Sequence, residues 1–198
     1  MRTIHTFGDS HAKHVWEAIQ TTNLKTHTHH IGAKLMYTFG KEKLNLLNIS
    51  DKQYNVIEGD YVCFCFGEID CRCHIFKYKD EYQETIQNLV NNYFEAIALN
   101  LQTINVKPIV FNVLPPSDLP IGEQNPEYPH LGTIQERITY TKTMNNCLKN
   151  GCELYNYIFL DVYDSYCNKE GSLDSAYTRD RVHIKNPCHI IDFLENHI

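Results

Sequence analysis

The chain alternates short apolar segments with longer segments of helical periodicity, and this alternation limits its fold more than any other feature. Extended segments are predicted at residues 2–7, 26–31, 61–66, 108–113 and 154–160. Helical or amphipathic patterns lie at residues 11–20, 44–49, 80–103, 134–148 and after Pro187. Parallel neighbours need a crossover connection, so strands that alternate with helices predict a parallel sheet covered on both faces. We expect a three-layer α/β/α sandwich with about five parallel strands.

Length and composition favour one core. The chain has 198 residues, and no Pro/Gly/Ser-rich or charge-run segment divides it, so we expect a single domain over residues 1–198. Hydrophobic residues make up 42% of the chain, which is ample for a core. The net charge is −6 and the basic residues are scattered, so no Lys/Arg stripe is available to neutralise a row of phosphates. We expect no nucleic-acid partner.

The apolar segments and the cysteines indicate the cellular compartment in which the protein is expected to lie. No apolar run reaches transmembrane length, and the first residues turn polar too soon for a signal peptide. We therefore expect a cytoplasmic protein with no membrane partner. The eight cysteines lie in a long chain without a secretory signal, which favours reduced thiols over a disulfide framework.

Two groups of metal-ligand residue types allow a zinc-binding alternative. The first has a C-x-C…C-x-C spacing that differs from the usual zinc patterns and comprises Cys63, Cys65, Cys71, Cys73 and His74. The second lies on a predicted strand, whose alternation places only His27 and His29 on one face. Buried core thiols and a solvated strand explain these groups without a metal, and we expect no metal site and no cofactor.

Three polar loops follow predicted strands. They are Gly8–His11, Gly67–Arg72 and the segment 180–183, in which Asp180 and His183 are the notable residues. The carboxyl ends of parallel strands meet at one edge of a sheet, and ligands bind in the crevice beyond that edge. We therefore expect the three loops to lie together around one site.

The residue types of these loops indicate acyl chemistry. Ser10 lies at a predicted strand-to-helix turn, where free N–H groups and the helix dipole favour negative charge on an attacked carbonyl oxygen. A serine hydroxyl needs a histidine to accept its proton and an acid to orient that histidine. Asp180 and His183 would lie on one side of a helical turn, with Cβ atoms about 5–6 Å apart. We predict that Ser10 is the nucleophile, His183 the base and Asp180 the orienting acid.

The chain resembles the SGNH or GDSL hydrolases, a family of serine esterases, lipases and acyltransferases with a flavodoxin-like fold. Gly8-Asp9-Ser10-His11 is similar to the first block of the family, with a histidine after the serine in place of the common leucine. The D-x-x-H segment at 180–183 is similar to the last block. The resemblance implies that the N–H groups of Ser10 and Gly32 stabilise the oxyanion. His11 either contacts the substrate or packs beside Ser10.

The third block departs from the family pattern. The family has G-x-N-D, and its asparagine donates to the oxyanion, whereas this chain reads Gly67-Glu68-Ile69-Asp70. Ile69 cannot donate a hydrogen bond, and losing one such donor lowers the rate by about 100- to 1000-fold. Either the enzyme is slow or another donor substitutes, and Arg72 is a candidate for binding the oxyanion or a substrate carboxylate. The alternative is that Glu68, Asp70 and Arg72 form an ion network that shapes the loop.

These observations predict a serine ester hydrolase that acts on a small polar ester, such as an O-acetylated carbohydrate, through an acyl-enzyme on Ser10. A glycan O-acyltransferase would use the same residues and differ in how well it excludes water. The missing asparagine motivates a third alternative, a non-catalytic protein that binds carbohydrate or another partner on the same fold. The oligomeric state is left open by the sequence.

Overall fold

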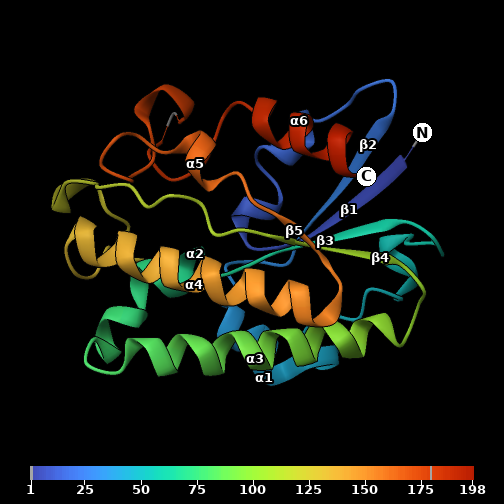
Figure 1. Ribbon diagram of the computed structural model, residues 1–198, viewed down its shortest axis with the longest axis horizontal. Helices are drawn as coiled ribbons and strands as arrows, with labels where there is room; N and C mark the ends of the chain where they lie inside the picture. Colours follow the sequence, from blue (N-terminus) through green and yellow to red (C-terminus); the bar gives the residue numbers. More distant parts are fainter. Residues whose placement is uncertain (1, 179) are drawn as a thin grey trace.

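The computed structural model describes residues 2–178 and 180–198 and contains one five-stranded sheet (Figure 1). All neighbouring strands pair in parallel, in the order β2-β1-β3-β4-β5. The strands are β1 (Arg2–Gly8), β2 (Leu24–His30), β3 (Tyr61–Cys65), β4 (Lys107–Phe111) and β5 (Ile158–Leu160). This is the flavodoxin-like strand order. The predicted parallel sheet and its strand number are confirmed.

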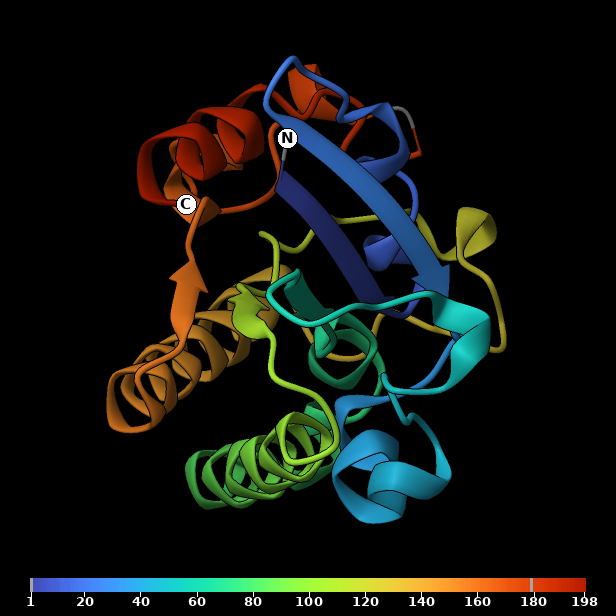
Figure 2. The same ribbon diagram turned by 90° about the vertical axis from the view of Figure 1, so that its right-hand side faces the viewer.

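Helices cover both faces of the sheet, as Figures 1 and 2 show. One face packs against α1 (Met36–Glu42), α3 (Tyr82–Leu101) and α4 (Ile134–Tyr155). The other packs against α6 (Cys188–His197), the short helix α5 (Tyr163–Tyr166) and 3₁₀ turns after β1. Each face has its own cluster of buried apolar side chains, so the three-layer α/β/α architecture is confirmed.

The predicted helix at residues 11–20 is wrong. The chain forms two 3₁₀ turns there, Ser10–Ala12 and Trp16–Ala18, separated by exposed residues. Thr26 Oγ1 donates to the carbonyl oxygens of Trp16 and Ile19, so β2 takes the place of a helical hydrogen-bond ladder. Because no regular helix follows Ser10, no helix macrodipole favours negative charge at the serine. Only the free N–H groups of the turn are available to stabilise such a charge.

Two helices also differ from their predicted extents. Helix α1 lies outside the amphipathic stretch at 44–49 and was not anticipated, since no local side chain caps its first turn. Helix α4 continues to Tyr155, beyond the predicted end at residue 148, so β5 begins only at Ile158 instead of at residue 154. The predicted helices at 80–103 and after Pro187 correspond to α3 and α6.

The strand order reverses between β1 and β3, which are hydrogen-bonded neighbours. Gly8 ends β1 beside Cys65 at the end of β3, and a Cβ atom on Gly8 would lie 1.9 Å from the Cys65 carbonyl oxygen. Only glycine allows this close approach. The turn that carries Ser10 therefore begins at the topological switch point, where doubly wound sheets bind their ligands.

Candidate active site

Ser10, His183 and Asp180 form a continuous hydrogen-bonded row. His183 Nε2 lies 2.7 Å from Ser10 Oγ, and His183 Nδ1 lies 2.6 Å from Asp180 Oδ2. Both distances fall within ordinary hydrogen-bond range. The structure thus brings Ser10 to His183, 173 positions further along the chain, and to Asp180, in the predicted order of nucleophile, base and orienting acid.

The segment 180–183 is a tight turn and contains no helix, so the predicted helical geometry of Asp180 and His183 is wrong. Arg181 adopts a left-handed backbone conformation with φ of 60°. Asp180 Oδ1 accepts hydrogen bonds from the backbone N–H groups of Val182 and His183 at 2.9 and 2.7 Å. The carboxylate therefore fixes the turn with one oxygen and the imidazole with the other.

The surroundings of this pair favour an ionised acid and a neutral base. Partial burial raises the pKa of Asp180, but the hydrogen bonds from the His183 ring and from two N–H groups outweigh it and hold that pKa well below its usual range. Burial and the charge of His11 lower the pKa of His183, against the opposing effect of Asp180. A histidine that is neutral near pH 7 can accept the proton of Ser10.

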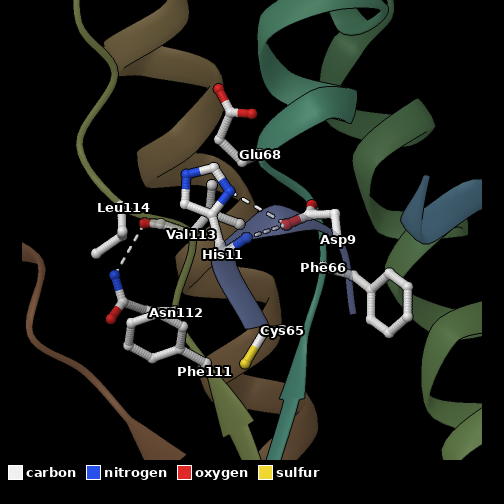
Figure 3. Close-up of a pocket in the computed structure, with 9 residues that line it drawn as sticks. All are labelled: Asp9, His11, Cys65, Phe66, Glu68, Phe111, Asn112, Val113 and Leu114. Atoms are coloured by element: carbon white, nitrogen blue, oxygen red, sulfur yellow. Dashed lines mark hydrogen bonds and ion pairs between the residues drawn. The ribbon is translucent and has the colours of Figure 1, made fainter. Parts of the chain in front are cut away.

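The His11 ring lies beside the His183 ring, with centroids 4.8 Å apart and ring planes tilted by 36°. Its Nδ1 is 3.1 Å from Asp9 Oδ1, and its Nε2 is 3.2 Å from the carbonyl oxygen of Val182. Figure 3 shows the Asp9 carboxylate beside the ring, with Glu68 above it. Because both ring nitrogens bond within the protein, His11 has no atom left for hydrogen bonding to a substrate.

The resemblance implies two backbone N–H groups, those of Ser10 and Gly32, as donors to an oxyanion. Within the described residues, the N–H groups of Ser10 and Gly32 have no hydrogen-bond partner. Gly32 follows β2 and adopts φ of 88°, and the preceding Ile31 N–H donates to the Gly8 carbonyl oxygen at 3.0 Å. This bond ties the Gly32 loop to the turn of Ser10. Ile69, at the position of the family asparagine, is buried in the core with 3% exposure and offers no donor.

Glu68 and Arg72 pair with each other on the short helix α2 (Glu68–Cys73). Arg72 donates through Nε and Nη2 to the two carboxylate oxygens of Glu68, at 2.6 and 3.0 Å, and through Nη1 to the Tyr128 carbonyl oxygen. Leu131 N–H donates in turn to the Arg72 carbonyl oxygen. These bonds favour the ion-network alternative, in which the pair anchors the loop at 115–132, over Arg72 as an anion-binding group.

Asp70 has a structural position. It is 1% exposed, and its carboxylate accepts the N–H groups of Met36 and Tyr37 at 2.7 and 3.2 Å. It thereby caps the first turn of α1 from a distant part of the chain. Burial, opposed by these two donors, raises the pKa of Asp70 to about 7. Gly67 is a packing residue, since a Cβ atom there would lie 2.8 Å from both Met36 Cε and Val113 Cγ2.

Several residues that touch the site were not anticipated from the sequence. Ser117 Oγ donates a short hydrogen bond to the Arg181 carbonyl oxygen, so the loop after β4 supports the turn of Asp180 and His183. His14 is exposed, and its ring centroid lies 4.1 Å from that of His183. The length and proline content of the loop at 115–132 indicated a wall of the site, but no local pattern singles out Ser117.

The alternative metal ligands do not assemble around an ion. All eight cysteines are free thiols, and Cys63 and Cys65 lie in the core with Sγ atoms 3.7 Å apart. His29 bonds His5 at 3.0 Å instead of facing solvent. Residues 2–178 and 180–198 contain no group of three or more His, Cys, Asp or Glu side chains arranged to hold a metal ion. Across the same residues, no helix is long and apolar enough to cross a membrane.

Comparison with known proteins identifies the fold. The chain matches a GDSL-like lipase from Bacteroides thetaiotaomicron with a TM-score of 0.61 and 14% identity, over 98% of this chain and 84% of the lipase. It matches phospholipase A1 from Streptomyces albidoflavus with a TM-score of 0.61 and 11% identity, over 100% and 99% of the two chains. An acetylxylan esterase from Geobacillus stearothermophilus matches with a TM-score of 0.53 and 15% identity, over 98% and 91%.

No known family profile and no curated protein matches the sequence. The structural neighbours are all less than 25% identical to the chain, so they establish the fold alone. That fold is the one which the SGNH resemblance implied, and the fold class predicted from the sequence is confirmed.

Proposed function

We propose that this chain is a serine ester hydrolase whose nucleophile is Ser10. The observation that carries the proposal is the row from Asp180 Oδ2 through the His183 ring to Ser10 Oγ, with distances of 2.6 and 2.7 Å. A hydroxyl, an imidazole and a carboxylate in this order make up the constellation that activates a serine for acyl transfer. It lies at the switch point of the sheet, with two free N–H groups nearby.

The reaction follows from the roles of these groups. Ser10 Oγ attacks the ester carbonyl carbon while His183 Nε2 takes the hydroxyl proton, and the N–H groups of Ser10 and Gly32 donate to the oxyanion. The ester C–O bond then breaks, and His183 returns the proton to the departing alkoxide. Water attacks the acyl-enzyme with His183 again as base, which releases the carboxylic acid and restores Ser10. Asp180 stabilises the imidazolium in each step.

The structural neighbours support an ester hydrolase through their described activities, which include lipases, a phospholipase and an acetylxylan esterase. Catalytic mutants of the acetylxylan esterase replace a serine, an aspartate and a histidine, and the aspartate precedes the histidine by three positions. Asp180 and His183 have the same spacing. This agreement supports the assignment of the acid and the base here.

The substrate class that we propose is an O-acetylated carbohydrate. Two observations support this substrate class. One is the similarity of the fold to the acetylxylan esterase, and the other is a cavity of about 520 Å³ between α1, α2 and α3. Its lining includes Asp70 on α2 and Leu35 just before α1, together with Tyr37, Tyr78, Asn88 and Asn92. Both tyrosines are exposed, and exposed aromatic faces beside amide groups suit a ring with apolar faces and hydroxyl edges.

Labelling and hydrolysis test the nucleophile. A fluorophosphonate probe is expected to label wild-type protein and not Ser10→Ala, and wild-type protein is expected to hydrolyse p-nitrophenyl acetate at least about 1000-fold faster than the variant. Absence of labelling, together with equal hydrolysis by both proteins, would favour the non-catalytic alternative. Labelling with faster acyl transfer to an added glycan than to water would favour the acyltransferase.

The substrate class has a separate test. Tyr78→Ala is expected to raise KM for acetylated xylo-oligosaccharides while leaving hydrolysis of p-nitrophenyl acetate unchanged, since the small ester does not reach the cavity. Tyr155→Ala, which removes a half-exposed tyrosine on α4, serves as the matched control. Equal kinetics of Tyr78→Ala and wild type on both substrates would contradict the carbohydrate proposal without affecting the role of Ser10.

A further inference from the structure

His11 occupies a position where both of its ring nitrogens face acceptors. Nδ1 lies 3.1 Å from Asp9 Oδ1, an oxygen that already accepts the backbone N–H of His11 at 2.8 Å. Nε2 lies 3.2 Å from the carbonyl oxygen of Val182, which can only accept. A neutral imidazole has one N–H and could satisfy only one of these acceptors. The doubly protonated imidazolium donates to both acceptors.

The environment of His11 stabilises this charge. The side chain is 7% exposed, so burial alone lowers its pKa, but the hydrogen bond and charge of Asp9, the charge of Glu68 and the Val182 carbonyl raise it to about 9. Figure 3 shows the Asp9 carboxylate beside the ring and the Glu68 carboxylate above it. The titratable or charged groups that face it are Asp9 on its own turn, Cys65 on β3, Glu68 with its partner Arg72 on α2, and His183 with Asp180 on the C-terminal turn.

We propose that His11 is a positioning residue for the general base. Its imidazolium clamps the Val182 carbonyl, and hence the turn at 180–183, onto the Ser10 turn, and it places a fixed positive charge beside the His183 ring. The clamp holds His183 Nε2 at Ser10 Oγ, and the charge adds to burial in favouring the neutral form of His183. Neither function requires His11 to touch the substrate.

The size of the electrostatic effect follows from the geometry. Two unit charges on rings whose centroids are 4.8 Å apart shift a pKa by between about 0.6 and 2.5 units, for effective dielectric constants between those of water and a protein surface. Removing the charge of His11 should raise the pKa of His183 by that amount. His14, which also contacts the His183 ring, is exposed and makes no hydrogen bond to the turn within the described residues.

Histidine titration by NMR tests the proposal without any substrate. In the wild-type protein we expect the ring of His11 to stay protonated through pH 8 and that of His183 to titrate below 6.5. In His11→Gln the midpoint of His183 should rise by about 0.6 to 2.5 units. His197→Gln, which removes an exposed histidine at the end of α6, should leave that midpoint unchanged. Asp9→Asn, a second variant, should lower the midpoint of His11.

Kinetics provide the second readout, and this part alone depends on the proposed esterase activity. The acid limb of kcat/KM for p-nitrophenyl acetate should move to higher pH in His11→Gln by the same shift that NMR records, with kcat reduced more than KM is changed. A loss of activity without any shift of the acid limb would show a purely structural role and overturn the proposal. Titration of His11 near pH 6.5 in the wild-type protein would also overturn the proposal. That measurement needs neither a folded variant nor ester hydrolysis.

Discussion

Two polar clusters lie at the same edge of the sheet, and they differ in what their hydrogen bonds leave free. The row Asp180–His183–Ser10 ends on a hydroxyl whose only hydrogen-bond partner within the described residues is His183 Nε2, so its oxygen makes no other bond. In the cluster of Glu68, Arg72 and Asp70, by contrast, the guanidinium and both carboxylates bond within the chain. A reactive site needs an unsatisfied atom, and a structural network needs none.

This contrast reassigns part of the predicted site. Charged residues after β3 suggested a polar substrate pocket, but the pairing of Glu68 with Arg72 and the capping of α1 by Asp70 use those charges to hold two loops. Their contribution to the reaction is therefore indirect, through the placement of the Gly32 loop and of the loop after β4. Substitutions in the two clusters should separate activity from stability.

The largest effect is expected from His183→Ala. Removing the base should lower kcat/KM for p-nitrophenyl acetate by about 10⁴-fold or more, because Ser10 then has no proton acceptor. The side chain is 19% exposed, and its loss should leave the thermal unfolding midpoint within about 2–4 °C of wild type. His197→Ala is the matched control. Activity of His183→Ala within 10-fold of wild type would remove the distinction between the clusters.

Arg72→Met should affect stability instead of chemistry. It leaves the Glu68 carboxylate, of which only 14% is exposed, without its bidentate partner, and removing one member of such a pair costs about 3–5 kcal/mol. Urea unfolding should show this loss, and Glu68→Gln combined with Arg72→Met should recover part of it. A stable Arg72→Met protein without esterase activity would instead assign Arg72 to substrate or oxyanion binding.

The first cluster could be predicted from the sequence better than the second, and the reason is physical. Ser10, Asp180 and His183 stand out because their residue types and loop positions are set by chemistry, and parallel strands bring such loops to one edge. The roles of Arg72 and Asp70 depend on partners 56 and 34 residues away, Tyr128 and Met36, which no local pattern reveals.

The fold shows the same division. Strands in the middle of the sheet have continuous apolar runs, which predict them well, and the long helices α3 and α4 have clear periodicity. The segment after Ser10 has the periodicity of a helix, but its buried residues pack on the sheet from two separate turns. The first turn accepts a hydrogen bond from Thr6 on β1 and the second from Thr26 on β2. Tertiary hydrogen bonds override local preference there.

His11 links the first cluster to stability through pH. Its pKa in the folded protein is about 9, above the ordinary 6.5, so its contribution is fully present below pH 6.5 and is lost as the pH rises through 9. The full contribution is about 3 kcal/mol. The free energy of unfolding of wild type relative to His11→Gln should therefore fall between pH 6.5 and 9.5. A difference that stays constant over this range would mean that His11 is neutral in the folded protein.

The smallest effect is expected from Asp70→Asn. An asparagine keeps one acceptor for the N–H groups of Met36 and Tyr37 but turns an amide donor towards the other, so one donor of the α1 turn loses its partner. We expect a loss of about 1–2 kcal/mol in urea unfolding, the size of a lost helix cap. Asp51→Asn, which makes no side-chain cap at its 3₁₀ turn, is the matched control. Since α1 follows the Gly32 loop directly, kcat should fall modestly with KM unchanged; a large loss of activity at wild-type stability would place Asp70 in the chemistry and merge the two clusters into one site.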